Sequence, residues 1–553
     1  MNTGSRSRGA ARSTTVAAVT AALTGLTATC LVGAVGTPAG AAAAEAAAGA
    51  GDGASHRVFV SPDGHAGAAG TRPDPLASVN EAVARVADGG VVLLRGGTYA
   101  QRIKLKDVHG VTVRPFHHEQ VILDGGPLTP PPDRSAMVTI VNSSRVAVRG
   151  LDIRRYGTTS KRAVPIGIYV HGASSHISLV RNHVHSMGNY NGTLGSFDIN
   201  AHGIAVYGDR ARHPISDVRI HRNEVDHLAL GASESVVVNG NVKHWRITHN
   251  RIHDNNNIGI DAIGFESTLS GPARYTRANR ARDGVIADNV IRNIISRGNP
   301  AYYEDGGWCD CADGIYIDGG TGIRVERNRV IGNDIGIEVA AENARGSADH
   351  VVVADNFITR SGYVGIATGG YCDGADDCGG VETGRAFANR FLHNTLFANN
   401  QFADGSPEIL VQYHTNRTVI QGNVVRATGP AHALIGTVPR AQNDASSTAP
   451  RLDGNLYFAT GGPARASFGV LGVNYTGWQP YRTATGQDAH SRFADPRLRH
   501  PAGGDLHLRA GSPAIDAGIA VSPRWVGHRD IDGQPRVQGA RIDIGADERG
   551  RSR

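Results

Sequence analysis

A short phrase in which apolar and polar residues alternate recurs along most of the chain. Two copies, GIYIDGG at 314–320 and GIEVAAE at 336–342, begin 22 residues apart. Alternation of period two is typical of a strand with one buried face. A strand-and-turn unit repeated at this spacing predicts the coils of a β-solenoid.

Eight copies of the phrase are legible between residues 111 and 450. They are GIYVHG at Gly167, GIAVYG at Gly203, SVVVNG at Ser235, GIDAIG at Gly259, GIYIDG at Gly314, GIEVAA at Gly336, GIATGG at Gly365 and EILVQY at Glu408. Each is followed by a second phrase of the form V-x-I-x-x-N-x-V. Its asparagines are Asn182, Asn223, Asn250, Asn289, Asn328, Asn356, Asn394 and Asn423, with Asn455 in a looser copy. Side-chain amides at an inward bend can stack from coil to coil, so we predict a structural ladder.

The two ends of the repeat carry different patterns. Before it, a short strand (58–60) leads to an amphipathic helix (76–86) and then to the apolar stretch VVLLRGGTY. After it come DLHLRAGSPAIDAG and DIDGQPRVQGARIDIGADE, which we interpret as a segment that closes the last coil. We assign the acids of this segment to turns and caps, with a structural ion as the alternative: Asp516, Asp530, Asp532, Asp543 and Asp547.

Both end segments resemble those of secreted bacterial right-handed parallel β-helix proteins of the pectate-lyase-like superfamily. The resemblance implies an all-β solenoid with a helical N-terminal cap and a C-terminal closing segment, acting on polysaccharides. On this basis we expect the cap and first coil at 56–110, coils with loop insertions at 111–450, and the final coils and closing segment at 451–553.

The composition of the first residues predicts where the protein is located. Residues 1–47 hold arginines, an apolar run and then small residues, which predicts a signal peptide, and 48–55 form a linker. The formal charge of +6 gives only a weak hint of an anionic partner. We therefore expect a secreted monomer, with no membrane span in the mature chain and no nucleic-acid partner.

Cysteine usage agrees with export. Of five cysteines, Cys30 belongs to the predicted leader, which leaves Cys309, Cys311, Cys372 and Cys378. An even number in an exported chain favours disulfides. The sequence leaves open which of three pairings forms.

Carboxylates concentrate at outward positions of three consecutive phrases: Asp261, Asp318 and Glu338. With coils ~4.8 Å apart, Asp261 and Glu338 should lie about 10 Å apart, with Asp318 roughly 8 Å from each, on an open face. Such separations suit an inverting glycosidase, in which one acid protonates the leaving oxygen and the other activates water. We take Glu338 and Asp318 as the acid and base pair and Asp261 as a third carboxylate. The alternative is that these acids bind Ca²⁺ or pair with arginines such as Arg282 or Arg324.

Substrate-binding candidates surround these acids. On the repeat they are Tyr207, Asn239, Tyr316, Glu342 and His202. Insertions at 265–283, 297–313, 341–350 and 371–385 could form walls around a cleft, and they bring Trp308 and Tyr371, whose rings could stack on sugars. The alternative is that these rings only bury loop surface. Oxygen ligands for Ca²⁺ could come from Asp373, Asp376 and Asp377, although their spacing matches no defined calcium loop.

Three functions remain open at this stage. We favour a glycoside hydrolase. A polysaccharide lyase would need a Lys or Arg base and Ca²⁺ or an arginine to neutralise a uronate; the chain's four lysines all lie off the outward opening-phrase positions. The third possibility is a non-catalytic glycan-binding protein of the cell surface, since one fold supports many functions.

Overall fold

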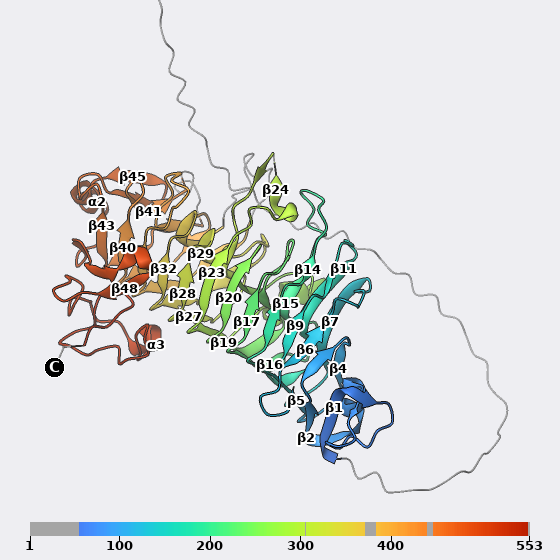
Figure 1. Ribbon diagram of the computed structural model, residues 1–553. Coiled ribbons are helices and arrows are strands. Elements are labelled where there is room, and N and C mark those ends of the chain that lie inside the picture. The colour runs from blue at the N-terminus through green and yellow to red at the C-terminus, as the bar shows by residue number, and fades with distance from the viewer. Residues whose placement is uncertain (1–54, 305, 371–382, 439–445, 551–553) are drawn as a thin grey trace, which may run out of the picture.

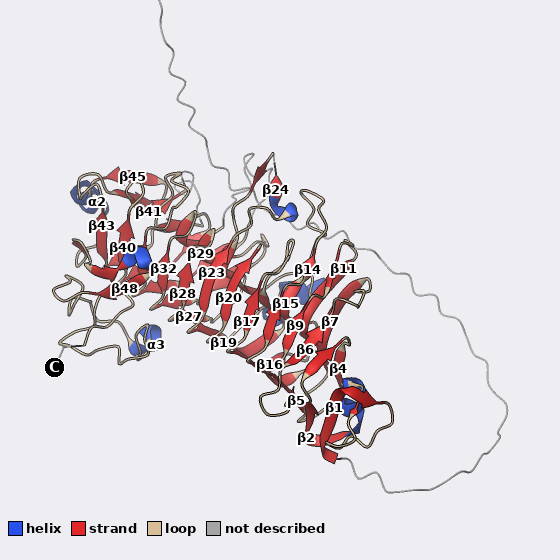
Figure 2. Cartoon of the chain, in the orientation of Figure 1, coloured by secondary structure: helices blue, strands red, loops and turns tan. Residues whose placement is uncertain are grey.

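The chain winds into a parallel β-helix. The computed structural model describes residues 55–304, 306–370, 383–438 and 446–550, and the predicted signal peptide and most of the linker lie outside them. Successive coils place one strand in each of three 13-stranded sheets, which run the length of the molecule (Figure 1). Strands dominate and helices occur mainly at the ends (Figure 2). This confirms the predicted right-handed parallel β-helix.

Sheet A is formed by the part of each second phrase that precedes the asparagine. Its strands, in spatial order, are β1 (Ser55–His65), β2 (Val86–Leu94), β5 (Thr112–Pro115), β8 (Ala147–Arg149), β12 (Ser175–Val180), β16 (Ile215–His221), β19 (Val242–Thr248), β22 (Val285–Ala287), β27 (Arg324–Glu326), β31 (Val352–Ala354), β35 (Arg390–Leu392), β39 (Val419–Gln421) and β42 (Arg451–Asp453).

Sheet B follows the asparagine bend. Its strands are β3 (Gly97–Tyr99), β6 (Val121–Asp124), β9 (Asp152–Arg154), β13 (His183–His185), β17 (Glu224–Asp226), β20 (Arg251–Asn255), β23 (Val290–Ile294), β28 (Arg329–Ile331), β32 (Phe357–Thr359), β36 (Thr395–Phe397), β40 (Val424–Ala427), β43 (Leu456–Ala459) and β46 (Arg492–Phe493).

Sheet C carries the opening phrases. Its strands are β4 (Ile103–Lys106), β7 (Asp133–Val141), β11 (Ala163–His171), β15 (His202–Gly208), β18 (Val236–Gly240), β21 (Ile260–Ile263), β26 (Asp313–Asp318), β29 (Ile335–Ala340), β33 (Val364–Thr368), β37 (Ile409–Val411), β41 (Ala433–Thr437), β44 (Ser467–Val470) and β45 (Val473–Thr476).

Small sheets of two or three short strands form in the loops between the large sheets. They are β10 (Gly157–Thr158) with β14 (Gly188–Asn189), β24 (Tyr303–Glu304) with β25 (Gly307–Trp308), β47 (Leu498–His500) with β48 (Asp505–Leu508), and the three-stranded set β30 (Ser347–Asp349), β34 (Arg385–Phe387) and β38 (Thr415–Asn416).

The β-helix is covered at both of its ends. At the N-terminal end, helix α1 (Val79–Arg85) starts at Ser78, whose side chain accepts a hydrogen bond from Glu81 N, and buries Val79, Ala82 and Val83. At the other end, β44 and β45 form an antiparallel hairpin beside α2 (Trp478–Thr485), whose Tyr481 ring stacks on Phe468 at 4.4 Å. These elements prevent the apolar interior from being exposed at an open end.

The predicted asparagine ladder is confirmed at every rung. Asn182 Nδ2 donates to Asn223 Oδ1 at 3.1 Å, and the same bond repeats through each predicted residue to Asn455. The other amide hydrogen satisfies a main-chain carbonyl, as where Asn289 donates to Ile247 O at 2.9 Å. Because each rung is buried, the ladder fixes the bend between sheets A and B in every one of these coils.

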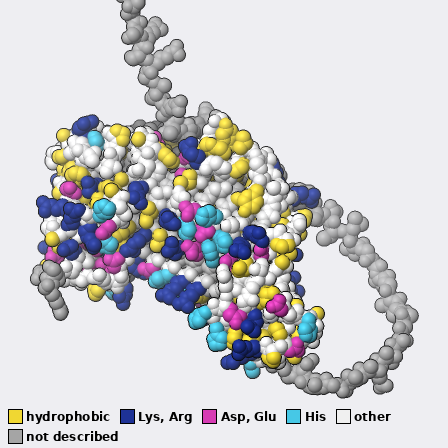
Figure 3. Space-filling view, viewed as in Figure 1, with side chains coloured by type: hydrophobic (Ala, Val, Ile, Leu, Met, Phe, Trp, Pro, Cys, Tyr) yellow, Lys and Arg dark blue, Asp and Glu magenta, His cyan; other side chains and the backbone are white. Residues whose placement is uncertain are grey.

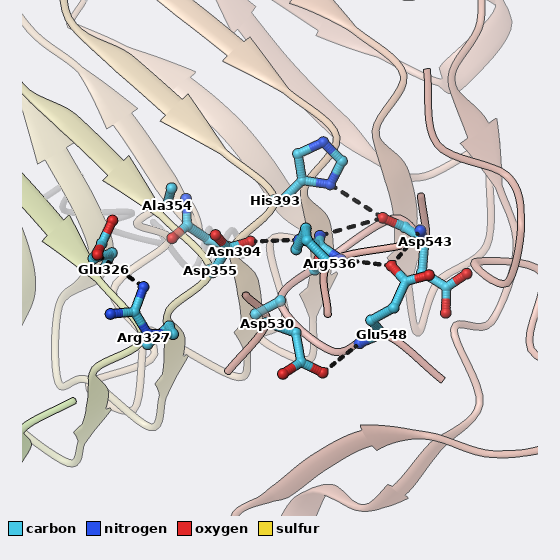
Figure 4. A network of polar contacts seen from close by, with 12 residues as sticks. Glu326, Arg327, Ala354, Asp355, His393, Asn394, Asp530, Arg536, Asp543 and Glu548 are labelled. Carbon is cyan, nitrogen blue, oxygen red and sulfur yellow. Dashed lines mark hydrogen bonds and ion pairs between the residues drawn. The ribbon is translucent and has the colours of Figure 1, made fainter. Parts of the chain in front are cut away.

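The C-terminal segment does more than close the last coil. Residues 495–550, including α3 (Pro523–Val526), return along the outside of the helix, where apolar residues of sheets A and B face outward to meet them. Arg536, fully enclosed, bonds Asp355 on the helix and Glu548 in the segment (Figure 4). The segment's acids serve turns: Asp530 Oδ1 accepts from Gln534 N at 2.8 Å, and Asp543 Oδ1 accepts from Asp516 N at 2.6 Å.

Candidate active site on sheet C

The outward row of sheet C has the predicted register. Asp261 pairs with Tyr316, and Tyr316 pairs with Glu338, on consecutive strands β21, β26 and β29. Asp318 lies two residues beyond Tyr316, opposite Ala340. The three predicted carboxylates therefore share one face, with Asp261 and Glu338 two coils apart.

That face is covered, contrary to the open surface expected from the sequence. Asp261 is 2% exposed, Asp318 4% and Glu338 7%. The insertion at 297–313 contributes to the cover, because Tyr302 is buried and the charges of Glu342, Glu234 and Asp313 all act on its hydroxyl. Tyr302 is held by a hydrogen bond of 3.1 Å from Asn257 Nδ2.

Two further carboxylates join the site because the alternation is interrupted before each phrase. The register skips the opening glycines between the pairs Ile166–His202 and Ile168–Ile204, and the residue before the opening glycine faces outward while Ile168 is in the core. Ile166 accordingly packs with Tyr169 and Tyr207 on the outer face. In the phrase that begins at Gly314 this break requires glycine, because a Cβ there would lie 2.8 Å from Gly336 O.

This row places Asp313 and Glu234 in the cluster. Sequence reasoning missed both, since strict alternation points them inward; His202, which was a candidate, occupies the same row and was the available signal. His202 Nδ1 lies 3.2 Å from Glu234 Oε2. Its Nε2 lies 3.4 Å from the Tyr207 hydroxyl.

Burial and mutual repulsion dominate the electrostatics. Burial raises the pKa of Asp261 well above its usual value, and Glu234 and Asp318 raise it further. Burial and then Glu266 do the same to the pKa of Asp318, and burial and then Asp318 to the pKa of Glu342. Such a set of acids can all be ionised only if a cation is bound among them. Otherwise some of them keep their protons.

Glu338 and Asp313 form a distinct pair within the cluster. A hydrogen bond joins their carboxyl groups, which requires one of the two to be protonated. Burial raises the pKa of Glu338 to about 7. Burial, together with the charge of Glu338, raises the pKa of Asp313 well above its usual value. Asp318 differs, because its Oδ1 accepts a hydrogen bond of 2.8 Å from Glu342 N, which favours its charged form.

Oxygen ligands for a metal ion are present in the same place. Carboxylate oxygens of Glu266, Asp318 and Glu342 lie within 4.8 Å of one another. Asp261 Oδ1 is buried with no hydrogen-bond partner among the described residues, as is Asp313 Oδ1. Hard oxygen ligands and uncompensated negative charge suit Ca²⁺. The acids predicted from the sequence to bind calcium, Asp373, Asp376 and Asp377, lie outside the described residues.

The remaining candidates divide between the site and its margin. Tyr316 is buried in the carboxylate row, and Asn239 Oδ1 accepts from Thr268 Oγ1 at 2.6 Å. Trp308 packs edge-on against Tyr303, with ring centroids 4.9 Å apart. Tyr371 lies outside the described residues.

A cation lies at the N-terminal side of the cluster that sequence reasoning missed. The Arg134 guanidinium sits 4.6 Å from the centre of the Tyr207 ring. It also interacts electrostatically with Glu234. Arg134 comes from β7, outside the eight legible repeats, so no phrase register pointed to it.

One disulfide lies in the insertion beside the site. Cys309 and Cys311 are joined, which is compatible with one of the pairings left open above. Cys372 and Cys378 are outside the described residues. Within the described part of the chain, helices are all too short or too polar to cross a membrane.

The fold and this face define a class: parallel β-helix proteins with a buried carboxylate cluster on one sheet. The chain belongs to the family of YwoF, an uncharacterized protein of Bacillus subtilis, with 31% identity over 467 residues that cover 84% of this chain and 93% of YwoF. No family model matches. Pectate lyase PEL9 of Emericella nidulans is 30% identical over 125 residues, which cover 21% of this chain and 30% of that enzyme. Among solved structures, pectate lyase Pel9A aligns over 90% of this chain and 98% of its own, with 13% identity and a TM-score of 0.43.

Proposed function

We propose that the protein is a secreted polysaccharide-degrading enzyme, a glycoside hydrolase in which Glu338 donates the proton and Asp318 acts as the base. The observation that carries this proposal is the contact between the carboxyl groups of Glu338 and Asp313, beside an Asp318 that instead accepts a hydrogen bond from Glu342 N. General acid catalysis works best when the pKa of the acid is near the working pH, and the pKa of Glu338 is about 7.

The roles follow from the two environments. Glu338 would protonate the oxygen of the leaving sugar. When Glu338 takes up a proton again, Asp313 would compete with it for that proton. Asp318 would take a proton from water as the water attacks the anomeric carbon; burial raises its pKa, and the hydrogen bond from Glu342 N offsets part of that rise. Asp261 is the third carboxyl group of the site; burial favours its protonated form, which would donate a hydrogen bond to the bound sugar.

Binding groups continue along the same sheet toward the N-terminus. Tyr207 on β15 and Asn239 on β18 are opposite one another, two coils and one coil before the strand of Asp261. Arg134 adds a positive charge at the Tyr207 ring. A substrate lying along the helix axis would therefore meet hydroxyl, amide and guanidinium groups before it reaches the acids, which suits a glycan with anionic sugars.

The test is a glycan panel with the full mature protein, measuring new reducing ends and unsaturated products separately. Glu338→Gln and Asp318→Asn should each lower turnover by a factor of roughly 10²–10⁴ while the melting temperature stays at or above that of the wild type. Glu408→Gln is the matched control, because Glu408 is a buried carboxyl on the same sheet that bonds Asn399 instead of the cluster. Full turnover in Glu338→Gln would refute the proposal.

A lyase is the second candidate, favoured by the local likeness to a pectate lyase and by the Glu266, Asp318 and Glu342 oxygens. On this alternative those residues would hold Ca²⁺, which would neutralise a uronate carboxylate, and Arg134 would be the cation that acts on the sugar. The two candidates separate cleanly. A hydrolase yields reducing ends without unsaturation after treatment with a chelator, whereas the lyase yields unsaturated products that disappear with the metal.

A further inference from the structure

A second cluster of chemical groups lies on sheet B, on a different face from the carboxylates. The strands β9, β13, β17 and β20 are neighbours, and each places one residue in the core: Ile153, Val184, Val225 and Ile252. The residues on either side therefore face outward. Figure 3 shows histidine and acidic side chains gathered over β17 and β20, near the middle of the view.

Register brings these side chains together in two rows. One row runs Asp152, His183, Glu224, and the other runs Arg154, His185, Asp226, His253. One ligand atom each from Glu224, Asp226 and His253 lies within 4.8 Å of the other two. His253 Nε2 is 3.1 Å from Glu224 Oε1 and 3.5 Å from Asp226 Oδ2. His183 Nε2 approaches that same Asp226 oxygen at 3.0 Å.

These separations match the edges of a metal's coordination shell. Bonds of about 2.0–2.1 Å in a tetrahedral zinc site place neighbouring ligand atoms roughly 3.3 Å apart. An ordinary histidine–carboxylate pair needs one acceptor, whereas His253 Nε2 faces two carboxylates at once. Imidazole with carboxylate is a donor set for zinc and related first-row metals, and calcium prefers oxygen alone.

The supporting shell is already in place. His253 Nδ1 bonds Asp254 Oδ2 at 2.6 Å, which directs Nε2 toward Glu224 and Asp226. Asp226 Oδ1 is taken by His227 Nδ1 at 3.0 Å, which leaves Oδ2 to point at His183 and His253. Carboxylate–histidine–metal relays of this kind orient ligands in zinc sites. His253 and Asp226 are buried while Glu224 is 38% exposed, so an ion has a route of entry beside Glu224.

We propose that Glu224, Asp226 and His253, with His183 as a fourth ligand, form a binding site for Zn²⁺ or a similar first-row divalent metal. The site is structural or regulatory and independent of the acids on sheet C. Arg251 Nε, 3.4 Å from Glu224 Oε1, holds that side chain when the metal is absent. Arg292 lies 3.8 Å from Asp254, the carboxylate that orients His253, and adds a positive charge there.

The experiment uses untagged full-length secreted protein stripped with a chelator and titrated with Zn²⁺ by calorimetry, with Ca²⁺ in a parallel titration. We expect one Zn²⁺ per chain at micromolar affinity or tighter, no comparable Ca²⁺ binding to this site, and Co²⁺ absorption bands typical of tetrahedral coordination. His253→Gln and Glu224→Gln should each weaken Zn²⁺ binding at least tenfold. Asp254→Asn, which touches no ion, should weaken it by roughly 10–100-fold through loss of orientation.

His221→Gln is the matched control, a half-buried histidine of β16 in the same coil that bonds Thr248 and no carboxylate. It should bind Zn²⁺ as the wild type does. The proposal fails if Zn²⁺ binding is equally tight in Glu224→Gln and wild type, or if His221→Gln loses as much affinity as His253→Gln. Because Glu224 is partly exposed, its variant keeps the test decisive even if His253→Gln folds poorly.

Discussion

Arg536 and Asp355 form a buried ion pair, with Arg536 Nε 2.9 Å from Asp355 Oδ1 although the two residues are 181 positions apart in sequence. Arg536 also bonds Glu548 Oε2 at 2.7 Å. The pair links the returning C-terminal segment to the wall of the β-helix (Figure 4). A buried pair of this kind gives register to the two surfaces it joins, even where its net contribution to stability is small.

Replacing Arg536 with Met should therefore loosen the C-terminal segment. The change leaves Asp355 and Glu548 buried without their cation, which typically costs about 3–5 kcal/mol. We expect lower resistance to urea and faster proteolysis within 495–550, measured by fluorescence and by mass spectrometry of the fragments. Arg529→Met, an exposed arginine of the same segment, should change neither. Equal behaviour of the two variants would contradict the role given to Arg536.

The asparagine ladder makes a second prediction. Asn289 Oδ1 accepts from both Asn250 N and Asn250 Nδ2 at 2.9 Å, and Asn289 Nδ2 donates to Ile247 O and to Asn328 Oδ1. Asn289→Ala leaves several of these buried groups unpaired, at about 1–3 kcal/mol each before relaxation. The melting temperature should fall clearly. Asn474→Ala, on an exposed strand, should leave it within error of the wild type.

Much of this architecture could be predicted from the sequence because it is periodic. Alternation in the opening phrases fixed the register that aligns Asp261, Tyr316 and Glu338, and the asparagines marked the bend. The position of Asp313 could not be predicted in this way, because a close contact between the backbones at Gly314 and Gly336 interrupts the alternation. The burial of the acids depends on insertions, and the path of 495–550 depends on contacts with distant coils, neither of which follows a repeat.

The carboxylate cluster predicts an unusual pH dependence of stability. The pKa of Glu338 rises from its ordinary value to about 7 on folding. A raised pKa means that the folded state binds the proton more tightly, so this contribution is fully present below about pH 4.5 and is lost as the pH rises through 7. For Glu338 alone the change is on the order of 3 kcal/mol. In the presence of a chelator, the free energy of unfolding should fall between pH 5 and pH 8.

The same measurement on Glu338→Gln provides the control, since the amide keeps the size of the side chain and cannot ionise. Its stability should fall less steeply over that range. A slope identical to that of the wild type would show that Glu338 titrates normally in the folded protein, and the assignment of Glu338 as proton donor would lose its physical basis.

Asp261 should reveal a conflict between the site and the stability of the fold. Burial raises its pKa well above the usual value, and its Oδ1 has no hydrogen-bond partner among the described residues. At pH 8 the wild-type Asp261 releases its proton on unfolding, which favours the unfolded state. Asp261→Asn removes this effect, so the variant should be more stable than the wild type at pH 8. Below pH 4, where the acid is protonated in both states, the difference should vanish. Activity should fall at the same time, because functional sites retain groups that cost stability. Thermal unfolding at pH 4 and pH 8, paired with turnover on the same samples, checks both statements; a variant that loses stability at pH 8 would mean that Asp261 is held ionised by a bound cation.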